Sequence, residues 1–324
     1  MIGCGTTTFT DPDDYPGSMP EAAIDLVLTS SERFRALLTW VKLRRLSVVR
    51  LEESVPRIAS IALAPTPLFV SFPLGRTSPP IWNGRPMQRG EMVLHGRGEH
   101  FHQRTTGPCH WGMASLAPED FAKYSRALLG TEVATPAAMR ILRPSRGAVG
   151  DFLRLHKQAC RLAQTKPNTA AHPEIVRALE QGLVHALINC LPDDEPPEPA
   201  GAWQHHSEII LQFEQALAAR QGRSLPLPEL CAILGVAERT LRICCAQLLG
   251  MSPLRYARLR RLNLVRSALL RANPKASTVA TIARTYGFSE LGRFAVAYRT
   301  VFGETPSATL RRAGYLATDA AEFA

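Results

Sequence analysis

Two segments near the C-terminal end of the chain carry residue types that could read the bases of DNA. Arg239 and Arg242 would share one side of a helix, because residues three apart face the same way. Further along, Arg293 is suited to guanine, which accepts two hydrogen bonds from a guanidinium group, and Val296 or Leu291 could contact a thymine methyl group. These residues predict sequence-specific contacts in the major groove, provided that helices present them there.

A group of histidines in the first half of the chain raises the question of metal binding. Its members are His95, His100, His102 and His110. Two of the imidazoles would lie on one face of a strand, since His100 and His102 are two residues apart. A competent metal site needs at least three matched ligands, but no acidic residue lies between His102 and Glu119. Arg104 would also repel a cation. We therefore expect structural or solvated histidines, with no metal and no cofactor.

Sequence motifs of enzymes are missing from the chain. It contains no Gly-x-Ser-x-Gly elbow, phosphate-binding loop or dinucleotide fingerprint, so we expect no catalytic residue and no enzymatic activity. The seven cysteines include no Cys-x-x-Cys pair, and the neighbouring Cys244 and Cys245 would diverge on a helix. Reduced thiols are expected. The glycine pairs in Gly3-Cys4-Gly5 and Gly96-Arg97-Gly98 predict turns.

Length and charge indicate two domains of different character. The chain has 324 residues and a formal net charge of +10. Sixteen Lys or Arg and four acids lie between Arg220 and Arg312, a net +12, and the remainder is −2. The positive excess could attract nucleic acid, acidic protein or lipid. No run approaches ~20 apolar residues, and the polar start lacks the pattern of a secretory signal, so we expect a cytoplasmic protein with no membrane partner.

Strand and turn signals dominate the first half of the chain. Short strands are expected to begin near Ser47, Arg57, Pro67, Glu91 and His110. Helices are expected over 118–130, 150–165 and 173–191. The predicted fold class is α+β, with an N-terminal β-sandwich or barrel, a helical layer and an all-α C-terminal domain.

A proline- and acid-rich stretch at 192–201, PDDEPPEPAG, predicts a semi-rigid linker. The predicted domains are therefore 1–191 and 202–315, with a tail at 316–324. Ser207 is expected to cap the first helix after the linker, which would end at Arg220.

The C-terminal domain contains one helical unit twice. Leu248-Leu249-Gly250-Met251-Ser252-Pro253 reappears 53 residues later as Val301-Phe302-Gly303-Glu304-Thr305-Pro306. In each copy a short helix ends at a glycine, Gly235 or Gly287, and a second helix follows. Helix, glycine turn and helix is the arrangement that places a second helix in the major groove. A basic helix over 254–271, ~27 Å long, would hold the two second helices about one DNA turn (~34 Å) apart.

Together these units supply the residues expected to bind DNA. On the second helices these are Arg239, Thr240, Arg242, Leu291, Gly292, Arg293 and Val296. Of these, Arg239, Arg242 and Arg293 are expected to reach base edges. The candidates for phosphate contact or for positioning the scaffold are Arg258, Arg261 and Arg299.

Residues 228–312 resemble the AraC/XylS family of transcriptional regulators. In the second unit the resemblance rests on Ile282-Ala283, Gly287-Phe288-Ser289, Arg293-Phe294, Tyr298-Arg299, Phe302-Gly303 and Thr305-Pro306-Ser307. In the first unit it rests on Val236, Arg239, Thr240, Leu241, Gly250, Ser252 and Pro253. It implies binding to double-stranded DNA through two helix-turn-helix units. Cys245 stands where the family usually has phenylalanine, and Ile243 stands where a basic residue is common, which removes one expected DNA contact.

The N-terminal half resembles the cupin-like domains of such regulators more loosely, through the stretch from His102 to Gly112. The resemblance implies control by a small-molecule effector of unknown identity and allows a homodimer and contact with RNA polymerase. Trp82 and Trp111 could line a ligand pocket or belong to the core. The alternatives are a metal-dependent cupin enzyme carrying a DNA-binding domain and an architectural DNA binder without an effector.

Overall fold

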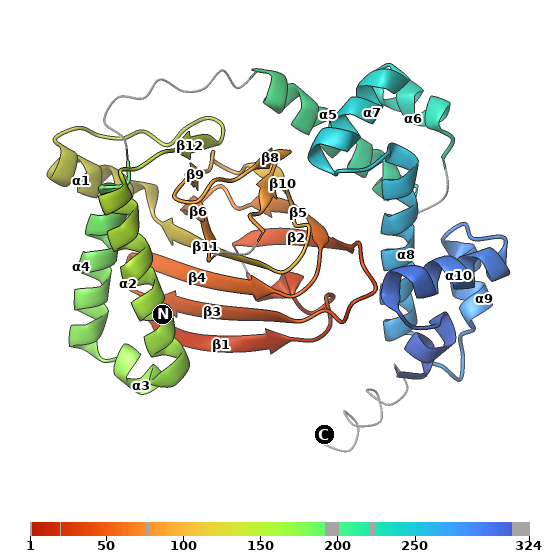
Figure 1. The fold of residues 1–324 in the computed structure, drawn as a ribbon, viewed down its shortest axis with the longest axis horizontal. Helices are drawn as coiled ribbons and strands as arrows, with labels where there is room; N and C mark the ends of the chain where they lie inside the picture. Colours follow the sequence, from red (N-terminus) through yellow and green to blue (C-terminus); the bar gives the residue numbers. More distant parts are fainter. Residues whose placement is uncertain (1, 20, 76–77, 192–200, 221–224, 313–324) are drawn as a thin grey trace.

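The computed structural model of the chain describes residues 2–19, 21–75, 78–191, 201–220 and 225–312. A β-rich part with flanking helices comes first, and an all-helical part lies beside it (Figure 1). The fold class is therefore α+β, as the sequence predicts. Among the described helices, none is both long and apolar enough to cross a membrane.

Two antiparallel sheets form the N-terminal part. The larger has the strand order β1-β3-β4-β11-β6-β9-β12 and the smaller the order β2-β5-β10-β7-β8. The strands of the larger sheet are β1 (Gly3–Phe9), β3 (Ala36–Lys42), β4 (Leu46–Glu53), β6 (Leu68–Leu74), β9 (Met92–Leu94), β11 (Cys109–Leu116) and β12 (Arg140–Leu142). Those of the smaller sheet are β2 (Ala22–Leu28), β5 (Arg57–Leu63), β7 (Ile81–Trp82), β8 (Arg85–Pro86) and β10 (His100–Arg104). All five strands expected from the sequence are present, as β4, β5, β6, β9 and β11.

Both faces of the larger sheet are buried. Phe69 points toward the smaller sheet and packs with Trp82 and Phe101, because successive residues of a strand face opposite sides. Val70 points the other way, into a second core that helices complete. Those helices are α1 (Pro118–Leu129), α2 (Arg146–Thr165), α3 (Pro167–Ala170) and α4 (Pro173–Ile188). In Figure 1, α2 and α4 run along the outer side of the sheet, so the expected helical layer is present.

The expected turn at Gly3-Cys4-Gly5 is wrong, because these residues begin β1. Gly5 pairs with Trp40 of β3, and a Cβ atom at Gly5 would stand 2.9 Å from the Trp40 ring. Glycine here makes room for an indole ring, a reason that no local pattern reveals. The Gly96-Arg97-Gly98 turn is confirmed, with φ of +63° at Gly98.

Helix α5 (Gly201–Ala219) begins earlier than expected. Ser207 lies inside this helix and does not cap it, because no glycine or proline between residues 202 and 206 interrupts the backbone. The predicted linker residues 192–200 and the predicted tail 316–324 lie outside the described residues.

The next helices of the C-terminal part are α6 (Leu227–Leu234), α7 (Glu238–Leu248), α8 (Pro253–Arg271), α9 (Val279–Thr285) and α10 (Leu291–Phe302), and the described residues 306–312 are helical as well. Helices α5, α6 and α7 share one apolar core with the first half of α8. Helices α9 and α10 share a second core with its last half. The internal repeat of the sequence thus corresponds to two small apolar cores, which pack against the two halves of one helix, α8.

Candidate nucleic-acid interface

The first unit presents one face of α7 to solvent. Helix α6 ends at Gly235, whose φ of +64° lies in the left-handed region that residues with a Cβ avoid. The turn leads into α7, which buries Leu241 and Cys245 against the rest of the unit. Arg239 and Arg242 are exposed on the opposite side, as the sequence predicts, and Thr240 is half-buried.

The second unit repeats this arrangement with larger core side chains. Gly287 has a φ of +76°, and Phe288 is buried just after it. Helix α10 buries Phe294 and Tyr298. Exposed residues on its other side are Gly292, Arg293, Val296 and Arg299, whereas Leu291 is half-buried against the core.

Helix α8 fixes the two units relative to each other. Its 19 residues span ~28 Å at 1.5 Å per residue. Tyr256 and Leu259 pack into the first core, and Val265 and Leu269 pack into the second. The spacing of the two units therefore depends on a continuous, buried helix rather than on a loop.

Arginines of α8 have different surroundings. Arg258 is exposed. The Arg261 guanidinium lies over the Phe288 ring, 5.0 Å from its centre, and burial together with neighbouring Arg258 lowers its pKa. This cation–π contact ties α8 to the turn before α10.

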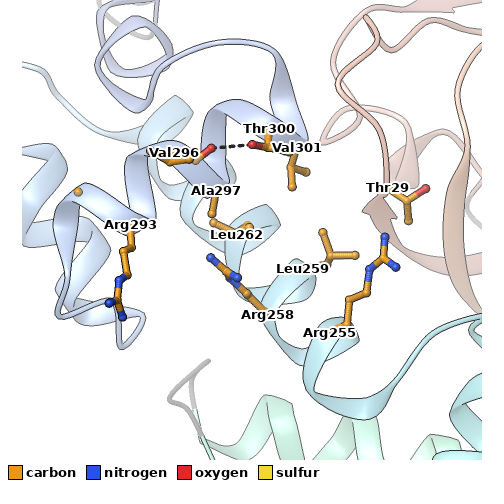
Figure 2. Close-up of a pocket in the computed structure, with 11 residues that line it drawn as sticks. Thr29, Arg255, Arg258, Leu259, Leu262, Arg293, Val296, Ala297, Thr300 and Val301 are labelled. Atoms are coloured by element: carbon orange, nitrogen blue, oxygen red, sulfur yellow. Dashed lines mark hydrogen bonds between the residues drawn. The ribbon is translucent and has the colours of Figure 1, made fainter.

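Two surface hollows lie on these helices. One, of about 640 Å³, lies between α8 and α10, with Arg258 and Arg293 on its walls and Val296 beside them (Figure 2). Thr29 of the N-terminal part stands at its far end, near Arg255. The other hollow, of about 370 Å³, is lined by residues of α7 alone: Glu238, Arg239, Arg242, Ile243 and Ala246.

Two of the exposed arginines are paired with acids at the beginning of their own helices. Arg242 Nη2 lies 2.6 Å from Glu238 Oε1, and Arg293 Nε lies 3.1 Å from Glu290 Oε2. Pairs between such exposed groups stabilise by roughly 0.2–1 kcal/mol. They can therefore open at little cost when a phosphate or a base offers stronger hydrogen bonds.

The N-terminal part contacts the opposite side of α8. Arg260 Nη2 lies 2.9 Å from Asp25 Oδ2, and Arg266 Nη1 lies 3.2 Å from Asp11 Oδ1. Between these two pairs, the backbone N–H of Leu28 donates to Asn263 Oδ1 at 3.1 Å. The basic residues of α8 are thus divided between a face against the N-terminal domain and a face turned to solvent.

Glu214 is the residue of this region that sequence reasoning missed. It is buried on α5, where Oε2 lies 2.9 Å from His102 Nε2 and accepts a hydrogen bond from Ser60 at 2.9 Å, and where Oε1 accepts one from Tyr256. Burial by itself would raise the pKa of the Glu214 carboxyl, but His102, Tyr256 and Arg260 outweigh burial and lower it to about 2. Glu214 and His102 are 112 residues apart, so no local signal could connect them.

The histidines and tryptophans singled out in the sequence have structural surroundings. His100 Nε2 lies 2.8 Å from Ser60 Oγ, so both histidines of β10 border the Glu214 cluster. Within the described parts of the chain, no group of three or more histidines, cysteines or acids could hold a metal ion. Trp82 and Trp111 are both buried in the core between the sheets.

Comparison with known proteins identifies the C-terminal part. A family model described as a helix-turn-helix domain matches residues 230–312. A probable thc operon regulatory protein of Rhodococcus erythropolis is 28% identical over 189 residues, which cover 57% of this chain and 56% of that protein. The XylDLEGF operon transcriptional activator 2 of Pseudomonas putida is 38% identical over 103 residues, 32% of this chain and 64% of that protein. The chain thus spans less than two thirds of either relative.

One solved structure is similar to about a third of the chain. The probable AraC family transcriptional regulator from Rhodopseudomonas palustris CGA009 is 36% identical, and the match covers 33% of this chain and 98% of that one, with a TM-score of 0.30.

Two helix-turn-helix units on a shared long helix have the architecture of a DNA-binding domain, and the relatives that match it are named as regulators of transcription. In residues 230–312 the chain is thus similar to the DNA-binding part of AraC/XylS-type regulators.

Proposed function

We propose that the chain binds two successive major grooves of one DNA duplex, through α7 and α10. Arg239, Thr240 and Arg242 reach base edges from α7. Base contacts from α10 are assigned to Leu291, Gly292, Arg293 and Val296. The observation that carries the proposal is the packing of α8 into both cores, which presents two exposed arginine-bearing helices at a set spacing.

Phosphate contacts flank these base contacts in the proposed complex. Arg258 on α8 and Arg299 in the last turn of α10 are both exposed, where the DNA backbone would pass. Arg261 contributes mainly by positioning the second unit, because its guanidinium lies over Phe288. The net charge of +12 on residues 220–312 supports a large electrostatic contribution to the affinity for DNA.

The N-terminal domain supplies control in this proposal, through a small-molecule effector. Its acids pair with α8, the helix that sets the spacing of the two units. Thr29 borders the hollow that holds Arg293. A ligand that shifts the sheets against α8 would therefore change the presentation of α10. The name of the Pseudomonas putida relative favours activation. In this proposal RNA polymerase and a second copy of the chain are further partners.

The C-terminal part, residues 202–315, is expected to fold and bind DNA when expressed alone. Binding of this fragment and of the full chain should weaken steeply with salt, because each phosphate contact releases condensed counterions. The measurement is the affinity for one duplex at several salt concentrations. If the full chain bound at low salt and the fragment did not, the proposed boundary between the domains would be wrong.

Purified protein is expected to hold much less than one metal ion per chain. His102 is engaged with Glu214, whose oxygens already accept hydrogen bonds from Ser60 and Tyr256. Elemental analysis of the full chain gives the metal content. A stoichiometric metal that disappeared, together with the effector response, in a His100→Ala, His102→Ala variant would favour the metal-dependent alternative.

A further inference from the structure

Two exposed aliphatic side chains occupy equivalent positions in the two units. Ile243 on α7 is 42% exposed, and Val296 on α10 is 69% exposed. They are 53 residues apart, the same offset that relates Gly250 to Gly303 after each helix. The repeat therefore places a branched aliphatic residue at the same point of both recognition helices.

Both side chains point away from the cores of their units. Ile243 lies two residues after Leu241 and two before Cys245, which are buried. Two residues of helix correspond to a rotation of about 200°, so Ile243 is on the opposite side. Phe294 and Tyr298 flank Val296 in the same way.

The surroundings of these two residues favour DNA over an apolar protein partner. A single exposed aliphatic residue is ordinary on a protein surface. Ile243, however, shares a hollow with Arg239 and Arg242. Val296 shares the other hollow with Arg258 and Arg293. Glu238 also lines the first of these hollows, but it is paired with Arg242 and the two arginines leave a net positive charge there. An aliphatic residue in a net positive hollow suits the major groove, where phosphates border the 5-methyl group of thymine.

We infer that Ile243 and Val296 are matched specificity determinants, each contacting the 5-methyl group of a thymine in its own half-site. The inference rests on the proposed binding of α7 and α10 to successive grooves. Ile243 would then make an apolar contact with DNA, where a basic residue at this position would make a polar one. The preferred duplex would then carry thymines at equivalent places about 10–10.5 base pairs apart.

The test uses the full chain and duplexes enriched from a random pool. Each thymine of the enriched sequence is replaced in turn by deoxyuridine, which removes only the methyl group. At two positions about one turn apart the affinity should fall roughly three- to fivefold, the effect of exposing about one buried carbon. Ile243→Ala should abolish the loss at one of these positions, and Val296→Ala the loss at the other.

Ile233→Ala is the matched control. Ile233 on α6 is 49% exposed, yet it does not line either hollow, so both methyl effects should persist in this variant. Equal affinity for thymine and deoxyuridine at every position would overturn the inference, as would methyl effects that survive both alanine substitutions. Failure to enrich any sequence would overturn the proposed function itself, and the inference with it.

Discussion

Arg293→Ala is expected to weaken binding to the preferred duplex by roughly 1–3 kcal/mol and to remove discrimination at one base pair. The Arg293 side chain is 82% exposed on α10 and meets only a weak, exposed partner in Glu290. Its removal costs the free protein little, so the loss reports the contact with DNA. The measurement is the affinity of the full-length variant for preferred, single-mismatch and random duplexes at several salt concentrations.

Arg258→Ala provides the comparison for a phosphate contact. Arg258 lines the same hollow as Arg293 but lies on α8, outside the recognition helix. Its loss should weaken preferred and random duplexes about equally and lower the salt slope by about one. Arg239→Ala and Arg242→Ala should behave like Arg293→Ala, with weaker binding to the preferred duplex and loss of discrimination at one base pair each. Equal losses on all duplexes for these three variants would mean that they contact phosphate rather than bases.

Glu214→Ala is expected to lower the free energy of unfolding by about 3 kcal/mol, because it leaves His102 and Tyr256 buried without their shared partner. For a chain of 324 residues such a loss corresponds to a fall in Tm of roughly 4 °C. Thermal unfolding of the full chain, followed by circular dichroism, gives the value. Glu208→Ala on the same helix is the control, since Glu208 is exposed and should cost little. Equal, small effects of both substitutions would contradict the role given to Glu214.

The same carboxylate should make stability fall in acid. The folded pKa of Glu214, about 2, lies below the ordinary value of 4.5. Its contribution is therefore complete above pH 4.5 and is lost as the pH falls from there toward 2. Glu214→Gln retains hydrogen bonding without the charge, so its unfolding should depend less on pH over that interval. An unchanged pH dependence in Glu214→Gln would assign the acid sensitivity to other groups.

The recognition helices and their turns could be predicted from local sequence signals. Gly235 and Gly287 end α6 and α9 because the turn needs a positive φ, and both adopt one. Leu241, Cys245 and Phe294 mark the buried side of each second helix, so the exposed arginines opposite them followed from helical periodicity. The match to the helix-turn-helix family model lies in the same stretch, residues 230–312.

Other features depended on contacts between distant segments. Gly5 lies in a strand and is a glycine because the Trp40 ring of the paired strand fills the space beside it. No residue near Gly5 in the sequence indicates this contact. Serine is a favoured N-cap residue, so the sequence suggested that α5 would begin after Ser207. The helix instead begins at Gly201, six residues earlier. Such positions are decided by whether the chain before them can continue the helix.

Two helix-turn-helix units and the long helix between them could be predicted from the sequence, because glycine turns, helical periodicity and charge act over a few residues. The contact of Glu214 with His102, and those of the N-terminal acids with Arg260 and Arg266, could be found only in the folded chain. Those contacts join residues more than a hundred positions apart. Their formation depends on how the smaller sheet packs against α5 and α8, and packing of that kind has no local signature.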